Sequence, residues 1–189
     1  MLSKSQINEF YDVLVYSNCK INNKYFIVKN CVQISYNTIC RALTKSKGSK
    51  FDISKDKKNL LNFITEKIIS YNINDVFDEW HENLCEEIWK KYNLEIGYSQ
   101  HIINLTLKYI CCLYVNNGLT LTNINFDDCH FDITMPNIRE LEKNKLTIKL
   151  KSLLDINTYD YYKSIQERIK EISTKPTLIE FECDIWNNK

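Results

Sequence analysis

The sequence predicts a mainly α-helical protein, an irregular bundle of about six to seven helices around a central hydrophobic helix at residues 98–115. Three observations lead to this prediction. Only three glycines and two prolines occur in 189 residues, so the turns that β-sandwiches and barrels need are scarce. Apolar residues recur three and four positions apart in several segments, as on the buried face of a helix. The length suits one domain, residues 1–189, with a substantial core.

Two helices and a short strand are expected first. Ser3 and Gln6 form a capping box ahead of apolar residues at helical spacing, which predicts a helix over residues 4–17. The β-branched stretch KYFIVKN, residues 24–30, predicts a brief strand. A second helix is expected over residues 32–45.

A basic loop and two further helices follow. Residues 45–58 concentrate lysine and serine around a glycine, so we expect a mobile basic loop there. Ser54 is the expected N-cap of the next helix, and Asn74 or Asp75 that of a helix over residues 76–89. The outer face of this last helix is acidic and carries Asp78, Glu79, Glu82, Glu86 and Glu87.

The C-terminal half is expected to be helical up to its tail. Gly97 ends the preceding segment, and the central helix begins there. A short helix is expected over residues 136–145, because proline suits its first turn, and a last one over residues 157–172. We expect the tail after Pro176 to be extended.

Composition predicts a cytoplasmic protein. The sequence contains no apolar segment of signal-peptide type and no run of about 18 apolar residues, so we expect no contact with a membrane. The eight cysteines lack paired metal-ligand spacing, and we expect them to be small buried hydrophobes. We expect no metal, since no set of residues with metal-ligand spacing is complete, and no cofactor, since three isolated glycines cannot form a phosphate-binding loop or a dinucleotide fingerprint.

Charge is unevenly distributed along the chain. Residues 1–60 carry 11 basic and 4 acidic groups, whereas residues 61–100 carry 3 and 8. The basic third either contacts an anionic partner, such as a nucleic acid or a phosphate ligand, or docks on the acidic middle. Arginine, which phosphate and base readers prefer, is scarce, and this weakens the nucleic-acid prediction.

A polar stripe lies on the central helix. Gln100, Asn104 and Lys108 are spaced by four residues and so share one face of an otherwise apolar helix. With His101 they lie near the expected helix start, where free amides and the helix dipole can bind an anion. The alternative is a buried seam in which these side chains form hydrogen bonds within the protein.

Two histidines are candidates for chemistry. His130 lies in FDDCHFDI beside Asp132, and a carboxylate can orient an imidazole as a base or complete a metal site. No second ligand set completes a metal site, however. His81 lies in WHENLCEE, where Cys85 replaces the second histidine of the helical zinc motif, so a metalloprotease is excluded.

Two stretches carry a family resemblance. FDEWH supplies Phe77, Asp78, Trp80 and His81, and the helix GYSQHIINLTLKY supplies Gly97, Gln100, Asn104, Thr106, Lys108 and Tyr109. With these residues the chain resembles an uncharacterised family of small bacterial proteins that has an FDxWH segment followed by a GxxQxxxNxTxKY helix. His101 departs from the lysine that relatives place there. The resemblance implies motif positions and no chemistry, and it suggests that His81, Gln100, Asn104 and Lys108 line one polar pocket.

Two functions from different classes therefore remain. The first is a cytosolic binding or regulatory accessory protein of a bacterium or mobile element, including a defence system, that recognises an anionic ligand, a nucleic acid or a protein. The alternative is a nucleic-acid-processing or nucleotide-directed enzyme that uses His130, Asp132 and Lys108. The first is favoured because no activated nucleophile or metal set is complete in the sequence.

Overall fold

The computed structural model describes residues 23–45, 51–143, 146 and 148–187, and within them the predicted mainly α-helical bundle is confirmed. These residues form seven α-helices, two short 3-10 helices and no strand. The elements are α2 (Lys24–Lys45), α3 (Ile53–Ile69), α4 (Phe77–Tyr92), α5 (Ile96–Asn117), η1 (Phe126–Asp128), α6 (Met135–Lys143), η2 (Leu153–Asp155), α7 (Tyr159–Ile172) and α8 (Leu178–Asn187).

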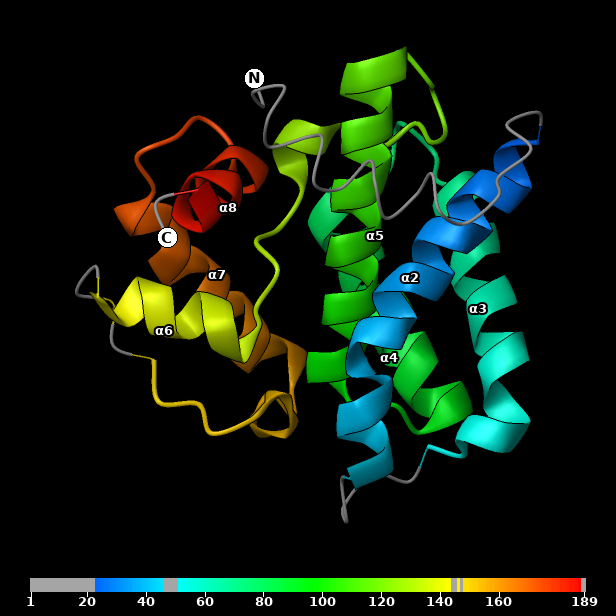
Figure 1. Cartoon of the computed structure of the whole chain (residues 1–189), viewed down its shortest axis with the longest axis horizontal. Coiled ribbons are helices and arrows are strands. Elements are labelled where there is room, and N and C mark those ends of the chain that lie inside the picture. Colours follow the sequence, from blue (N-terminus) through cyan, green and yellow to red (C-terminus); the bar gives the residue numbers. More distant parts are fainter. Residues whose placement is uncertain (1–22, 46–50, 144–145, 147, 188–189) are drawn as a thin grey trace.

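The predicted central helix is α5. Every residue from 96 to 113 is buried, because α5 is apolar on nearly all sides and can be covered all round. Helices α2 and α3 lie on one side of it, α6, α7 and α8 lie on the other, and α4 passes behind it (Figure 1). Helix α5 itself contacts α2, α4, α7 and η2.

The predicted strand at residues 24–30 is wrong, because this stretch is the first part of α2. The Asn23 side chain accepts a hydrogen bond from the Tyr25 N–H at 2.9 Å and so begins the helix. Ile27, Val28 and Cys31 are buried at helical spacing, and their packing outweighs the β-propensity of the stretch. The helix predicted at residues 4–17 lies outside the described residues.

The predicted loop at 45–58 is too long at its C-terminal end. Helix α3 begins at Ile53, so Ser54 lies inside the helix, and the Asp52 carboxylate accepts a hydrogen bond from the Lys55 N–H at 3.2 Å. Residues 46–50 of this loop lie outside the described residues.

The predicted extended tail is also wrong, because residues 178–187 form α8. Thr177 caps this helix by accepting from the Glu180 N–H at 3.2 Å. Leu178, Phe181 and Ile185 then lie on its buried side. Since proline is tolerated immediately before a helix start, Pro176 does not prevent helix formation.

The remaining predicted helices differ only at their ends. Helix α4 begins after Val76, which has no side-chain cap, instead of Asn74 or Asp75. Helix α6 lies at Met135–Lys143, and α7 is capped by Thr158, whose side chain accepts from the Tyr161 N–H at 3.3 Å.

Between α5 and α6 the chain returns through the interior. Gly118, in the left-handed conformation with φ of 65°, ends α5. Residues 129–134, called the linking segment below, then pass between α5 and the group formed by α7 and α8 (Figure 1). Cys129, His130, Phe131, Asp132 and Ile133 of this segment are all buried.

Candidate functional site

The linking segment crosses the interior without a helix or sheet to satisfy its backbone. A buried peptide group without a partner costs free energy. Gln100 on α5 donates from Nε2 to Ile133 O at 2.9 Å. Gln166 on α7 donates to Phe131 O at 2.7 Å and accepts from the Phe131 N–H at 3.0 Å. The glutamines therefore replace the hydrogen bonds that a neighbouring strand would provide.

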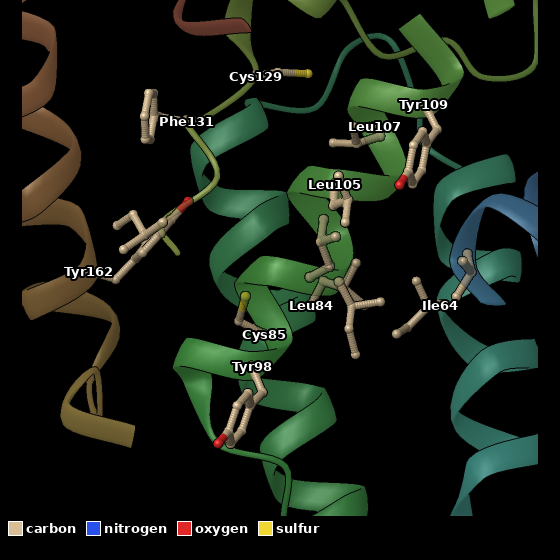
Figure 2. Close-up of a cluster of buried hydrophobic side chains, with 14 of the residues drawn as sticks. Ile64, Leu84, Cys85, Tyr98, Leu105, Leu107, Tyr109, Cys129, Phe131 and Tyr162 are labelled. Atoms are coloured by element: carbon tan, nitrogen blue, oxygen red, sulfur yellow. The ribbon is translucent and has the colours of Figure 1, made fainter. Parts of the chain in front are cut away.

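Asn104, the middle residue of the polar stripe, has several hydrogen-bond partners. Its Nδ2 lies 3.0 Å from Gln100 Oε1, 2.9 Å from the Tyr162 hydroxyl and 3.3 Å from Phe131 O. Tyr162 points from α7 toward the linking segment that carries Phe131 (Figure 2). Gln100 and Asn104 are only 0% and 3% exposed. Of the two alternatives, this geometry is that of a buried seam and not of a pocket wall.

His130 connects the linking segment to α4 and α7. Its Nε2 lies 2.8 Å from Asp78 Oδ1, and its Nδ1 lies 2.9 Å from the Tyr162 hydroxyl. The hydrogen bond from His130 lowers the pKa of Asp78 to about 2, and burial lowers the pKa of His130. Since an ionised Asp78 can only accept, His130 donates from Nε2. The neutral ring then accepts the Tyr162 hydroxyl at Nδ1.

His81 extends the same network from α4. Its Nε2 lies 3.0 Å from Asn104 Oδ1, and its Nδ1 lies 2.9 Å from the Tyr159 hydroxyl. Burial, reinforced by nearby His130, holds the pKa of His81 well below 6.5. An amide oxygen can only accept, so neutral His81 donates from Nε2 and accepts at Nδ1. Both ring nitrogens of each histidine are thus engaged within the protein.

Lys108 ends the stripe in a buried ion pair with Glu182 of α8, the two side chains being 4% and 1% exposed. The carboxylate also accepts from the Asp132 N–H and from Asn137 Nδ2, both at 3.2 Å. Burial alone would lower the pKa of Lys108, but attraction to Glu182 and Asp132 outweighs it and raises that pKa. The pair therefore fastens α8 and the linking segment to α5.

His101 forms a second buried pair beside the first. Its Nδ1 lies 2.7 Å from Asp132 Oδ1, and its Nε2 lies 2.6 Å from Thr38 Oγ1 on α2. Through His101, α2 is therefore connected to Asp132 of the linking segment.

The predicted catalytic residues belong to two different groups. His130 and Asp132 are neighbours in sequence, but no hydrogen bond joins their side chains in the described structure. His130 pairs with Asp78, whereas Asp132 and Lys108 belong to the group that contains His101 and Glu182.

At the start of α5, where the sequence suggested an anion site, backbone N–H groups donate hydrogen bonds to carbonyl oxygens of the chain itself. The Gly97 N–H donates to Ile156 O at 3.1 Å, and the Ser99 N–H to Glu95 O at 2.9 Å. A Cβ atom on Gly97 would lie 1.9 Å from Leu153 O. Glycine is thus required here for the close approach of η2 and not for a ligand.

Most partners of these residues were not predicted from the sequence. Asp78 was assigned to an acidic helix face and to the FDxWH motif, but not as a partner of His130. Glu182 was missed because the tail was predicted to be extended. The sequence nevertheless contained a pattern that could have predicted its role. Glu182 lies among Leu178, Phe181 and Ile185, which recur at helical spacing, and a carboxylate on the apolar face of a helix needs a buried cation as its partner. The other missed residues are Asn137, Tyr159, Tyr162 and Gln166.

Two clefts open at the surface, on either side of the turn before α4. Cleft 1 has a volume of about 550 Å³ and lies between that turn, η1 and the α7–α8 connection. Cleft 2 has a volume of about 450 Å³ and lies between the turn, α3 and α4. Asp75 and Val76 line both clefts. Of the network residues described above, Asp78 lines cleft 1, and its side chain is 42% exposed.

Metal binding and thiol chemistry have little support in the described part of the chain. No group of three histidine, cysteine, aspartate or glutamate residues in it could hold a metal ion. Six of its seven free cysteines are buried, as predicted, and Cys40 is half-buried. Burial raises the pKa of Cys111 and Cys112 to about 12, which keeps these thiols protonated and unreactive. Cys19 lies outside the described residues.

Comparison with protein-family models, with curated proteins and with solved structures found no match. No helix in the described ranges has both the length and the apolar character needed to cross a bilayer. The predicted contact of residues 1–60 with nucleic acid or phosphate stays a prediction, since residues 1–22 and 46–50 lie outside the described ranges.

Proposed function

We propose that the protein is a binding or regulatory accessory protein that holds a partner at its surface. One observation carries this proposal. The candidate site residues, at most 5% exposed, form hydrogen bonds with one another and with the chain's own backbone, so they build the scaffold. These residues are His81, Gln100, His101, Asn104, Lys108, His130 and Asp132.

An enzyme that uses these groups is the alternative. A general base must come within hydrogen-bond distance of its substrate, directly or through one water. Asp78 is the network group that faces a cleft, and its lowered pKa makes it a weak base at neutral pH. The geometry therefore supports binding more than catalysis.

The setting we propose is the bacterial cytoplasm, where the protein serves the bacterium or a mobile element that it carries. Free thiols throughout the described core support a reducing compartment. Recognition of an anionic ligand or a nucleic acid through residues 1–60 belongs to the same proposal and depends on the composition of that segment.

Two parallel measurements on the full chain test the proposal. In the first, the tagged protein is captured from its source cells after crosslinking, and we expect a partner at fixed stoichiometry. In the second, the pure protein is assayed for hydrolysis of single-stranded DNA, RNA and nucleoside triphosphates, and we expect no turnover. Turnover that is lost in Asp78→Asn but kept in Glu86→Gln, a carboxylate on α4 outside both clefts, would refute the proposal.

A further inference from the structure

The two clefts and the turn between them form one continuous feature, called here the acidic docking surface. It is defined by the lining residues of both clefts together with Ile73 in the turn. Ile73 and Val76 are 73% and 58% exposed. Large apolar side chains so exposed beside two clefts are typical of a surface that a partner covers.

The charge of this surface is predominantly negative. Three lysines line the clefts, but Lys67 is paired with Glu87 at 2.8 Å and Lys175 with Asp184 at 3.4 Å, which leaves Lys170 to offset the carboxylates. Six carboxylates line the same clefts: Asp75, Asp78, Glu79, Glu87, Asp127 and Asp128. With Glu87 paired to Lys67, five of them remain against Lys170.

Helix capping and ion pairing within the protein account for only some of these carboxylates. Asp78 and Glu79 lie in the first turn of α4, where the helix dipole favours negative charge. Asp75 and Asp127 are exposed, and within the described residues neither side chain forms an ion pair. Since like charges gathered in a cleft repel one another, a cationic ligand would relieve this repulsion.

An aromatic wall adds a second requirement for the ligand. Trp80 lines cleft 2 and is held edge-to-face against Tyr71 at 5.2 Å and tilted against Phe77 at 5.7 Å between ring centroids. A fixed indole beside carboxylates suits the aliphatic stem and charged head of lysine or arginine. Such side chains are chemically matched to both the wall and the charge.

We infer that the acidic docking surface binds a basic, amphipathic segment of a partner protein. Lysine or arginine side chains of that segment enter clefts 1 and 2, and an apolar side chain between them covers Ile73 and Val76. The inference rests on the proposed function and adds the chemistry of the partner. A polypeptide fits better than a metal ion, because no metal-binding group of side chains exists among the described residues.

Three labelled peptides and the full chain provide the test, with fluorescence anisotropy as the readout. The first peptide alternates lysine and leucine, the second replaces each lysine with glutamate, and the third replaces each leucine with serine. We expect the first peptide to bind about tenfold or more tightly than either of the others. Raising the salt from about 0.1 M to about 1 M shortens the Debye length from about 10 Å to about 3 Å and should weaken binding at least severalfold.

Substitutions in the acidic docking surface test whether the peptide binds there. Asp75→Asn and Asp127→Asn should each weaken binding of the lysine–leucine peptide about two- to fivefold. Val76→Ser should weaken it about fivefold or more. The matched controls are Glu86→Gln and Trp89→Ser, a carboxylate and a 52% exposed apolar side chain of α4 outside both clefts, and both should bind the peptide as the wild type does.

Several results would overturn the inference. They are equal binding of the glutamate peptide, equal losses in the controls, retention of a divalent cation that Asp75→Asn abolishes, or self-association that Val76→Ser abolishes while no peptide binds. If the peptides fail but a partner is still captured from cells, the docking inference falls and the proposed function stands. Turnover of a nucleic acid or nucleotide would instead contradict the proposed function.

Discussion

Replacing Asn104 with leucine tests whether the polar stripe of α5 is structural. Leucine has a similar size but no hydrogen-bonding group. The substitution leaves the His81 Nε2–H, buried in the core, without its acceptor. Such an orphaned donor costs roughly 1–3 kcal/mol of stability.

The other partners of Asn104 lose less, because each keeps a second contact. Phe131 O still accepts from Gln166 at 2.7 Å, and Gln100 Oε1 still lies 3.4 Å from the Ile133 N–H. The Tyr162 hydroxyl keeps His130 at 2.9 Å. Adding about 1 kcal/mol for each of these three weakened contacts gives a total loss of about 4–6 kcal/mol. In a chain of this length that corresponds to a fall in Tm of roughly 8–24 °C.

Urea unfolding followed by circular dichroism measures this loss. Asn59→Leu, on the exposed side of α3, is the matched control and should change stability by less than about 0.5 kcal/mol. Adding His81→Phe to Asn104→Leu removes the orphaned donor, so the double variant should lose less than the sum of the two single losses. A Tm for Asn104→Leu within a few degrees of the wild type would refute the structural role and restore the pocket hypothesis.

Two further predictions concern ionisable groups. Lys108→Met leaves the Glu182 carboxylate buried without its cation and should cost about 3–5 kcal/mol. Adding Glu182→Leu should recover part of this loss, because it removes the buried charge but leaves the Asp132 N–H without its acceptor; equal stability of the single and double variants in urea would contradict the pairing. The folded pKa values of His81 and His130 are lowered, so below pH about 6.5 the unfolded chain binds protons that the folded chain does not. The stability that the two neutral histidines contribute is therefore present above pH 6.5 and is lost as the pH falls. Asp78, with a folded pKa of about 2, extends the loss of stability below pH 3.8. Urea midpoints between pH 7.5 and pH 5 should therefore fall, and a flat or rising series would exclude the neutral histidines.

Helix prediction succeeded where the signal was local. The central helix was predicted within two residues at each end, because the apolar residues of 98–115 have the same spacing whatever surrounds them. Helix prediction failed at residues 24–30 and in the tail. There Asn23 and Thr177 cap the helices, and burial against distant helices outweighs the local propensity for extended structure.

The candidate residues were named correctly as a polar group, but their partners were not. The sequence showed Gln100, Asn104 and Lys108 on one face because i, i+4 spacing is a property of the helix alone. It could not show that Gln100 and Asn104 hold an extended segment from residues 129–134, since nothing in the spacing of one helix indicates what crosses it.

By itself the sequence thus determined the helical class, the central helix and the burial of most described cysteines, all of which follow from local periodicity and composition. Only the tertiary structure decided that His130 pairs with Asp78, 52 residues away, and Lys108 with Glu182, 74 residues away. Hydrogen-bond and ion-pair partners are selected by how helices cross in space, and that geometry is a property of the packed chain as a whole.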